Sequence, residues 1–373
     1  MRLTADIDLN PGFAFTKGGY TGNGTPVQWT PIGVSVTEPH AFWGVFDGNG
    51  HSISGVYINE TSDTGATGAT GLFRYVDSYH LTGTVKNLTI KNSYIGSKSH
   101  VTGSVAGVNC GTVENCKSSA FVRVDAQQGA VGGIGGVVGS NNNYWAVTKN
   151  CTFTGDVTAT GAAPYVGGIV GQNFKGYVKR CANSGSVTAS VDKVGGIVGS
   201  NIPLNTSDND KKYGEKAFDG KVLDCVNTGS ITGTDAVGGI VGYSEIWRTE
   251  LVPGEIARCE NSGRVTATDA KGPAGGIVGA FHGKAMDACW YSQAENINSG
   301  LAIVGWKAEN AQAPTNSGAL SILEPPTDVT ATPGDRQVAL SWTAPSNSGG
   351  AEITGYKVAY NTVDTAPMQR EDW

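Results

Sequence analysis

Histidines and aspartates are the residues of this chain that could carry acid–base or metal chemistry, and there are five histidines in all. None of the histidines stands in an H-E-x-x-H pattern, which would put two zinc ligands and a general base on one helical face. The candidate carboxylates fall at expected turns or in one polar stretch: Asp6, Asp8, Asp47, Asp156, Asp208, Asp210, Asp219 and Asp224. No pair of them recurs on successive strands. We therefore assign no catalytic residue, no metal ligand and no cofactor.

Threonine pairs recur in four strand-like segments that read VTAT, VTAS, ITGT and VTAT. Strand alternation sends the aliphatic residues and Ala or Gly inward, and the hydroxyl residues outward. The outward set is Thr158, Thr160, Thr188, Ser190, Thr232, Thr234, Thr266 and Thr268. If the segments stack, these side chains form an array that could contact a carbohydrate, another surface or ice. A solvent face built of strand-favouring residues is the simpler interpretation.

Two tryptophans, Trp145 and Trp247, lie in gaps of variable length between the repeats. An exposed indole can stack on a sugar ring, because it combines an apolar face with a polar N–H. Both residues are therefore candidates for glycan contact, and a core or capping role is the alternative.

Six of the seven cysteines occur at one repeated position, in segments such as VENC, VKRC and IARC. These residues are Cys116, Cys151, Cys181, Cys225, Cys259 and Cys289, and Leu88 takes the same place in an earlier unit. A position that accepts either Leu or Cys is an apolar, inward one. We expect a stack of core thiols, because side chains of adjacent rungs point the same way and do not meet the disulfide dihedral. Isolated disulfides or a metal site are the alternatives.

Internal repeats must position these residues. The string GGIVG occurs at 167–171, 195–199, 238–242 and 275–279, and the six repeat cysteines are spaced by 35, 30, 44, 34 and 30 residues. Each unit of about 30 residues holds three short β-segments joined by Gly-rich and Asn-rich turns. Such a unit buries its apolar side only by stacking on its neighbours. The pattern predicts an all-β parallel β-helix with three sheets; a propeller is disfavoured, because its blades need about 40 residues.

The repeats divide the chain into two parts. We assign residues 1–320 to the β-helix, with the clearest repeats at about 80–310. The polar stretch 201–220 is a loop insertion that accounts for the longest cysteine spacing. Residues 324–373 form a second part, too short for a complete β-sandwich of about 100 residues.

Composition agrees with this organisation. Gly accounts for 55 of 373 residues, and Val outnumbers Leu by 37 to 12, which favours strands over helices. The net charge is −6 without a basic cluster, so nucleic acid is a poor partner. No apolar run approaches the roughly 18 residues of a membrane-spanning helix. Residues 1–10 hold no apolar signal-peptide core, and we expect a fragment of a longer polypeptide.

The VGGIVG units, the N-terminal FDGNGHSISG pattern and the cysteine-centred segments resemble the GLUG-motif repeats of bacterial surface proteins over residues 3–310. Similar repeats occur in adhesins and in the non-catalytic region of IgA-cleaving metallopeptidases. A second resemblance begins at Glu324, where LSW and ITGYKV are similar to the first strands of a fibronectin type III domain. The two resemblances imply a β-helix followed by a truncated β-sandwich.

These resemblances imply a secreted or cell-surface bacterial protein that is non-catalytic and acts as an adhesin-like stalk or binding scaffold. The implied partner is a glycan or a host or cell-surface protein. Three alternatives are open: an accessory region of a larger secreted hydrolase or peptidase, a β-helix polysaccharide lyase or glycosidase, and an ice-binding protein. The oligomeric state does not follow from the sequence.

Overall fold

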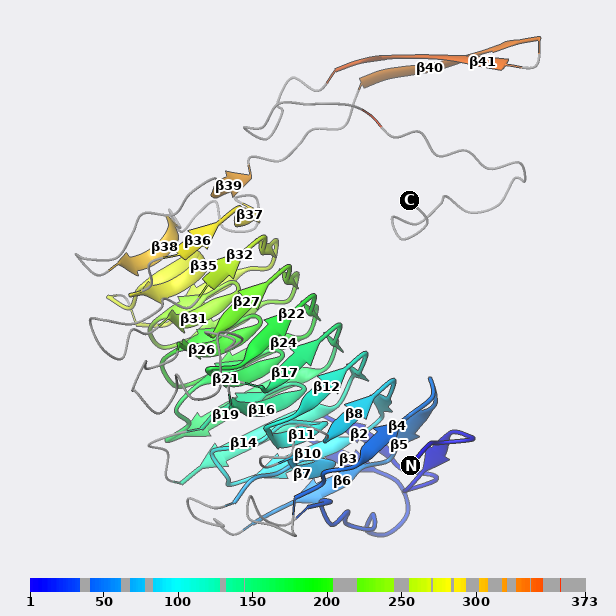
Figure 1. Ribbon diagram of the computed structural model, residues 1–373, viewed down its shortest axis with the longest axis vertical. Coiled ribbons are helices and arrows are strands. Elements are labelled where there is room, and N and C mark those ends of the chain that lie inside the picture. Colours follow the sequence, from blue (N-terminus) through cyan, green and yellow to red (C-terminus); the bar gives the residue numbers. More distant parts are fainter. Residues whose placement is uncertain are drawn as a thin grey trace. The chain divides into compact units, whose positions relative to one another are not determined.

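The computed structural model describes residues 1–33, 41–61, 68–77, 83–127, 132–143, 145–203, 220–244, 255–269, 271–282, 285–292, 302–307, 317–320, 327–335, 337–344 and 356. The described residues form strands and turns without a helix. Contacts divide the chain into two units, Met1–Ala319 and Leu320–Trp373. The parallel β-solenoid predicted from the repeats is confirmed in the first unit, where successive coils stack one on another (Figure 1).

One coil runs through five strands. The coil that begins at Phe121 passes through β14 (Phe121–Ala126), β15 (Ile134–Gly135), β16 (Val138–Asn142), β17 (Val147–Lys149) and β18 (Thr152–Phe153). Each strand pairs in parallel with its counterpart in the next coil, so the coils share four long sheets.

The four sheets have the following strands within the described residues. The seven-stranded sheet holds β6 (Tyr57–Asn59), β10 (Tyr94–Ser97), β14, β19 (Asp156–Gly161), β24 (Ser186–Ala189), β29 (Ile231–Gly233) and β34 (Val265–Ala267). The twelve-stranded sheet holds β7 (Phe73–Val76), β11 (Ala106–Asn109), β15, β16, β20 (Val166–Gly167), β21 (Val170–Phe174), β25 (Val194–Gly195), β26 (Val198–Ile202), β30 (Val237–Gly238), β31 (Val241–Ser244), β35 (Ala274–Phe281) and β38 (Ala302–Lys307). The eight-stranded sheet holds β4 (Val45–Asp47), β8 (Thr84–Lys86), β12 (Thr112–Glu114), β17, β22 (Tyr177–Lys179), β27 (Lys221–Leu223), β32 (Glu255–Ala257) and β36 (Ala285–Asp287). The ten-stranded sheet holds β1 (Ile7–Asp8), β5 (Ser52–Ser54), β9 (Thr89–Lys91), β13 (Lys117–Ser118), β18, β23 (Ala182–Asn183), β28 (Val226–Asn227), β33 (Glu260–Asn261), β37 (Trp290–Ser292) and β39 (Gly318–Leu320).

The expectation of three sheets is wrong, because the cysteine-centred segment is a corner and not one strand. The residue just before Leu88 or the cysteine has a left-handed backbone in every coil, with φ from 48° to 56°. These residues are Asn87, Asn115, Asn150, Arg180, Asp224, Arg258 and Ala288. A single left-handed residue redirects the chain, so the segment splits between the eight-stranded and the ten-stranded sheet.

The last glycine of each VGGIVG segment lies against the backbone of the neighbouring coil. A methyl group on Gly199 would lie 2.4 Å from the backbone nitrogen of Val166, and one on Gly242 would lie 2.5 Å from that of Val194. Two layers of backbone therefore touch at this point without side chains between them. Only glycine permits so close an approach.

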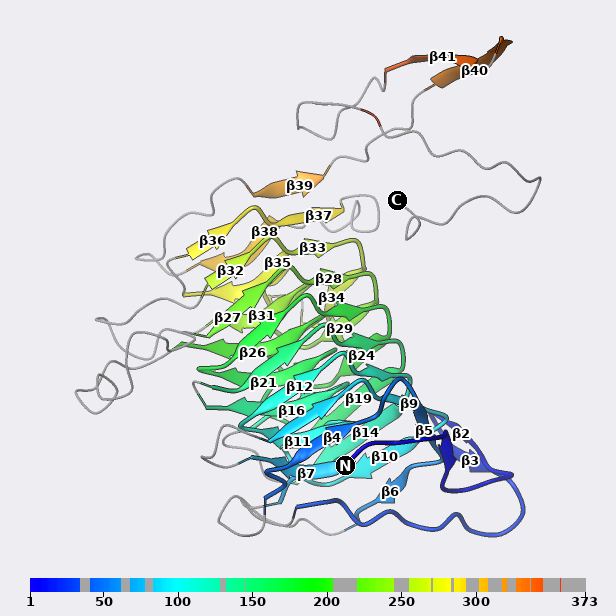
Figure 2. The ribbon, with the colours of Figure 1, turned by 45° about the vertical axis from the view of Figure 1, so that its right-hand side comes forward.

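The main core is an apolar cluster that runs from Phe46 to Tyr291 in the chain. Its residues come from the stacked coils, whose ribbon Figure 2 shows from a second direction. Its regular part is a column of inward residues from the seven-stranded sheet, paired in register from coil to coil: Val122, Val157, Val187, Ile231 and Val265. All of these side chains are buried. The column extends the core by one aliphatic residue per coil, at a rise of about 4.8 Å.

The two ends of the chain differ from the repeats. Near the N-terminus, the antiparallel hairpin of β2 (Ala14–Thr16) and β3 (Gly19–Thr21) packs aromatic rings onto the seven-stranded sheet; Phe15 stacks on Tyr57 at 5.7 Å. In the second unit, β40 (Thr327–Gly334) and β41 (Gln337–Thr343) form an antiparallel hairpin. This hairpin is the described part of the partial sandwich, and the fibronectin type III resemblance is not confirmed by it.

The backbone contact at Gly199 predicts that Gly199→Ala destabilises the solenoid by about 1–3 kcal/mol, the usual cost of forcing a methyl group into a packed site. Gly18→Ala is the matched control, because the nearest atom to a methyl group there lies 4.0 Å away. The midpoint of urea unfolding, followed by circular dichroism, measures both variants. Equal midpoints for the two variants would contradict the role of Gly199.

Candidate functional site

The predicted core positions lie at the corner between the eight-stranded and ten-stranded sheets. Leu88 and the six repeat cysteines are all buried there. The sulfur atom of each cysteine lies 3.2–3.4 Å from the carbonyl oxygen two residues earlier, as Cys225 Sγ does from Leu223 O. The thiol therefore satisfies a corner carbonyl as well as filling apolar space.

All seven cysteines are free thiols, and Cys110 lies apart from the corner column in a smaller apolar cluster. Burial, together with the neighbouring thiols, raises the pKa of Cys151 and of Cys225 well above the ordinary value. Burial raises the pKa of Cys110 to about 12. Since the thiolate is the reactive form, the geometry gives these cysteines a packing role and not a nucleophilic one.

A buried asparagine column follows the thiols, and the sequence reasoning above missed it. Asn183 donates from Nδ2 to Asn227 Oδ1 at 2.8 Å, and Asn227 donates to Asn261 Oδ1 at 2.7 Å. The Nδ2 of Asn227 also bonds to Gly229 O at 2.9 Å. The signal was present, because C-x-N-[ST]-G recurs at 181–185, 225–229 and 259–263. An amide can both donate to and accept from a copy of itself, so it satisfies a stacked interior position.

A second asparagine column lies at the end of the twelve-stranded sheet. Asn109, Asn141, Asn173 and Asn201 are fully buried, and each Nδ2 donates to the next Oδ1 at 3.0, 3.1 and 2.8 Å. Asn173 Nδ2 also bonds to Gly176 O at 3.0 Å. The column therefore holds the turn that leads into the eight-stranded sheet.

The threonine face is in register on the seven-stranded sheet. Thr158 pairs with Thr188, Thr188 with Thr232, and Thr232 with Thr266. These four alternate with buried neighbours along each strand, as in the i-B-i-B pattern at the start of β19. The second column, Thr160, Ser190, Thr234 and Thr268, is exposed or half-buried. The hydroxyl of Thr160 donates to Asp125 Oδ1 at 3.1 Å, and that of Thr268 to Gly233 O at 3.1 Å. The structure thus brings the eight residues together on one face.

Trp145 does not join this face. Trp145 is half-buried in the turn before β17, and its backbone N–H bonds to Asn143 Oδ1 at 3.4 Å. Trp247 lies outside the described residues.

The described candidate carboxylates are bound to donors in the folded chain. A hydrogen bond from Arg258, at 2.5 Å from Asp224 Oδ1, lowers the pKa of Asp224. A hydrogen bond from Asn87 lowers the pKa of Asp47, and the backbone N–H of Ser52 lowers that of Asp6. Carboxyl groups of lowered pKa stay ionised at neutral pH and are poorly suited to donate a proton. Within the described residues, no group of three His, Cys, Asp or Glu side chains is placed to hold a metal ion.

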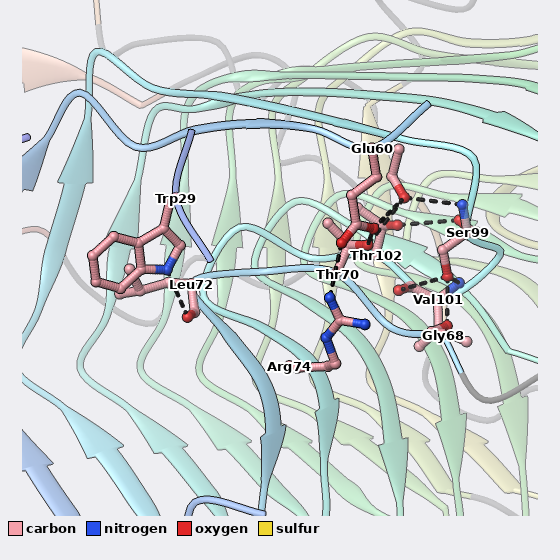
Figure 3. Close-up of polar contacts among 10 residues, drawn as sticks. Trp29, Glu60, Gly68, Thr70, Leu72, Arg74, Ser99, Val101 and Thr102 are labelled. Atoms are coloured by element: carbon pink, nitrogen blue, oxygen red, sulfur yellow. Dashed lines mark hydrogen bonds and ion pairs between the residues drawn. The ribbon is translucent and has the colours of Figure 1, made fainter. Parts of the chain in front are cut away.

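A buried polar cluster joins the first coils at the corner between the seven-stranded and twelve-stranded sheets (Figure 3). Glu60 accepts hydrogen bonds from Arg74 at 2.9 Å, from Thr70, and from Ser97 at 3.4 Å. Ser99 Oγ donates to Gly68 O at 2.6 Å. The Glu60 and Arg74 side chains are 12% and 18% exposed, so the ion pair is largely shielded from water.

Because the oxygens of Glu60 are occupied by a guanidinium and two hydroxyls, this carboxylate anchors the corner and is not free for acid–base work. The backbone is tied in as well, since the N–H of Ser99 donates to Ser97 Oγ at 2.9 Å. The cluster is therefore a structural clamp at the corner.

Comparisons with known proteins agree with the repeat architecture. The GLUG motif matches residues 130–158, which include β15 to β18 and the first residues of β19. Halomucin from Haloquadratum walsbyi is 32% identical over 149 residues, which are 40% of this chain and about 1% of halomucin. No solved structure matches the chain significantly. Among the described residues there is no helix with the length and apolarity needed to cross a bilayer. The chain thus contains a GLUG motif and is similar to a small part of halomucin.

Burial of the thiols predicts that the native chain does not react with DTNB at pH 8, whereas all seven cysteines react once urea unfolds it. Thr154→Cys is the positive control, because Thr154 is exposed on the outside of the corner. Absorbance of the released thionitrobenzoate counts the thiols. Fewer than seven in the unfolded, unreduced chain would reveal disulfides and contradict the free-thiol column.

The asparagine column predicts a pH-dependent defect for Asn227→Asp. A buried carboxylate cannot donate to Asn261, and we expect a loss of about 3 kcal/mol or more at pH 7. Burial raises the folded-state pKa of the new carboxyl group above its unfolded value, so the penalty shrinks as pH falls through that raised pKa.

Asn150→Asp is the matched control, because Asn150 forms the corresponding amide–amide bond on the outside of the solenoid. Urea midpoints between pH 4 and 7 measure both variants. A pH-independent gap between Asn227→Asp and the wild-type chain would contradict the burial argument.

Proposed function

We propose that this chain is part of a surface or extracellular repeat protein, in which the solenoid is a rigid, non-catalytic scaffold. The observation that carries the proposal is the unbroken parallel pairing of coils from β4 to β36. Each coil hydrogen-bonds to the coils on both sides, so bending the stack requires many bonds to distort together. Such a rigid structure suits a scaffold that presents a binding surface and holds it at a fixed distance from neighbouring parts of the protein.

The GLUG motif and the similarity to halomucin support an extracellular setting for the scaffold. The match spans about 1% of halomucin, so the comparable part is a small segment of a very long protein. By analogy, we infer that this solenoid is one of several segments in a longer polypeptide. The hairpin β40–β41 supports a fibronectin-like spacer after the solenoid in the sequence. The ring centres of Trp342 and Tyr356 lie 5.0 Å apart in this part of the chain.

The adhesin-like role is assigned to the threonine face. Thr158, Thr188, Thr232 and Thr266 line up in register, and this face is the one offered to a glycan or a cell-surface protein, although the hydroxyl oxygen of Thr158 is itself buried. A regular threonine array is also the surface that ice binding would require. Thermal hysteresis of the purified chain would indicate ice binding rather than adhesion. Release of unsaturated sugar products from polysaccharides would instead indicate a polysaccharide lyase.

Protease shaving of intact source cells tests the location. We expect an antibody raised against residues 83–244 to label unpermeabilised cells, and external protease to remove that label while a cytoplasmic marker stays intact. The in-register coils predict a protease-resistant core, so the released fragment should retain most of this range. Protection of the antigen until the cells are lysed would overturn the surface assignment.

A further inference from the structure

The corner between the seven-stranded and twelve-stranded sheets changes its length from coil to coil. Between the last outward Thr or Ser and the first residue of the next strand in the twelve-stranded sheet, the chain has residues 161–165, then 191–193, then 235–236, then 269–273. Two short turns therefore lie between two longer ones. Since neighbouring coils are about 4.8 Å apart, the short turns leave a recess at the edge of the solenoid.

The recess is a pocket of about 470 Å³ lined by Ala162–Tyr165, Ser190–Lys193 and Thr234. This volume falls within the range of small-ligand sites, about 300–1,000 Å³. The longer turn contributes Pro164 and Tyr165 to the lining, and the next coil contributes the polar side chains of Ser190, Asp192 and Lys193.

A cation lies between two aromatic rings at this recess. Lys193 Nζ is 5.4 Å from the centre of the Tyr165 ring and 5.2 Å from that of the Tyr243 ring. Tyr243 in turn packs against the His282 ring at 5.3 Å. Cation–π attraction to both rings holds the ammonium group in place, so its N–H donors are oriented before any ligand binds.

The lining combines the groups that recognise sugar hydroxyls. Lys193 donates hydrogen bonds, the exposed Asp192 carboxylate accepts them, and Ser190 does both. Tyr165 lines the recess and holds Lys193 in place through its ring, and Pro164 and Val191 add apolar surface for the C–H side of a pyranose ring. One positive and one negative charge line the pocket, so its charges balance.

We propose that this recess binds a short, uncharged segment of a glycan. The charge balance favours neutral sugars over uronic acids, because a second carboxylate would face Asp192. The proposal deepens the scaffold function by naming a ligand class for it, and it rests on that function only for its biological setting. Its test uses purified protein and is independent of where the protein resides.

Isothermal titration with neutral oligosaccharides (glucose-, mannose-, galactose- and N-acetylglucosamine-based) and with oligouronates tests the proposal on the full chain. We expect at least one neutral series to bind, and Tyr165→Ala to weaken that binding about tenfold or more. Ser190→Trp, which fills the recess from an exposed position, should abolish it. Tyr177→Ala is the matched control, because Tyr177 carries a similar lysine, Lys179 Nζ at 5.9 Å, on the eight-stranded sheet.

Unchanged affinity for Tyr177→Ala together with losses for both recess variants would support the site. Absence of neutral-sugar binding across the panel, binding of oligouronates alone, or equal losses at Tyr177 and Tyr165 would overturn it. Unfolding midpoints of each variant establish that a lost signal reflects the recess and not a collapsed fold. Failure here leaves the protease-shaving result intact, so the ligand and the location are tested separately.

Discussion

The structure depends on backbone-to-backbone contact at the glycines of the VGGIVG segments. Gly199 lies against the backbone of Val166, and Gly242 against that of Val194, at distances that exclude any side chain. This contact lets the chain fold back on itself within one coil and still pair in register with the next. The sheets, corners and columns of stacked side chains all follow from that register, because each residue meets its equivalent in the neighbouring coil.

Stacking of equivalents restricts which residues can occupy the interior. An asparagine is satisfied by a copy of itself, as Asn183, Asn227 and Asn261 are. A thiol is small, apolar and able to reach a nearby carbonyl, as Cys225 does. An ion pair needs two different partners: Glu60 and Arg74 form a largely shielded pair in the first coils, whereas pairs in the regular coils, such as Lys149 with Glu114, are more exposed to water. Repetition therefore selects self-complementary side chains for the core and leaves charge to the corners and ends.

The repeat period could be predicted from the recurring GGIVG and cysteine segments, the inward cysteines from the position they share with Leu88, and the threonine face from strand alternation. The number of sheets could not, because the left-handed residue before the cysteine is Asn150 in one coil but Arg180 and Ala288 in others, and no residue type marks it. The surroundings of Lys193 were hidden for another reason. Its neighbours Tyr165 and Tyr243 come from different coils, and turn length and register together decide that they meet.

The interval between β26 and β27 has a consequence for engineering. Strand β26 ends at Ile202 and β27 begins at Lys221, yet Lys221 still pairs with Tyr177 and Val222 with Val178, as in coils with short connections. The register of β27 on β22 is therefore kept across this long connection. A foreign epitope grafted there would leave that register intact. Grafts at the same junction of several coils would be displayed as a row along one side, spaced by the rise of the solenoid.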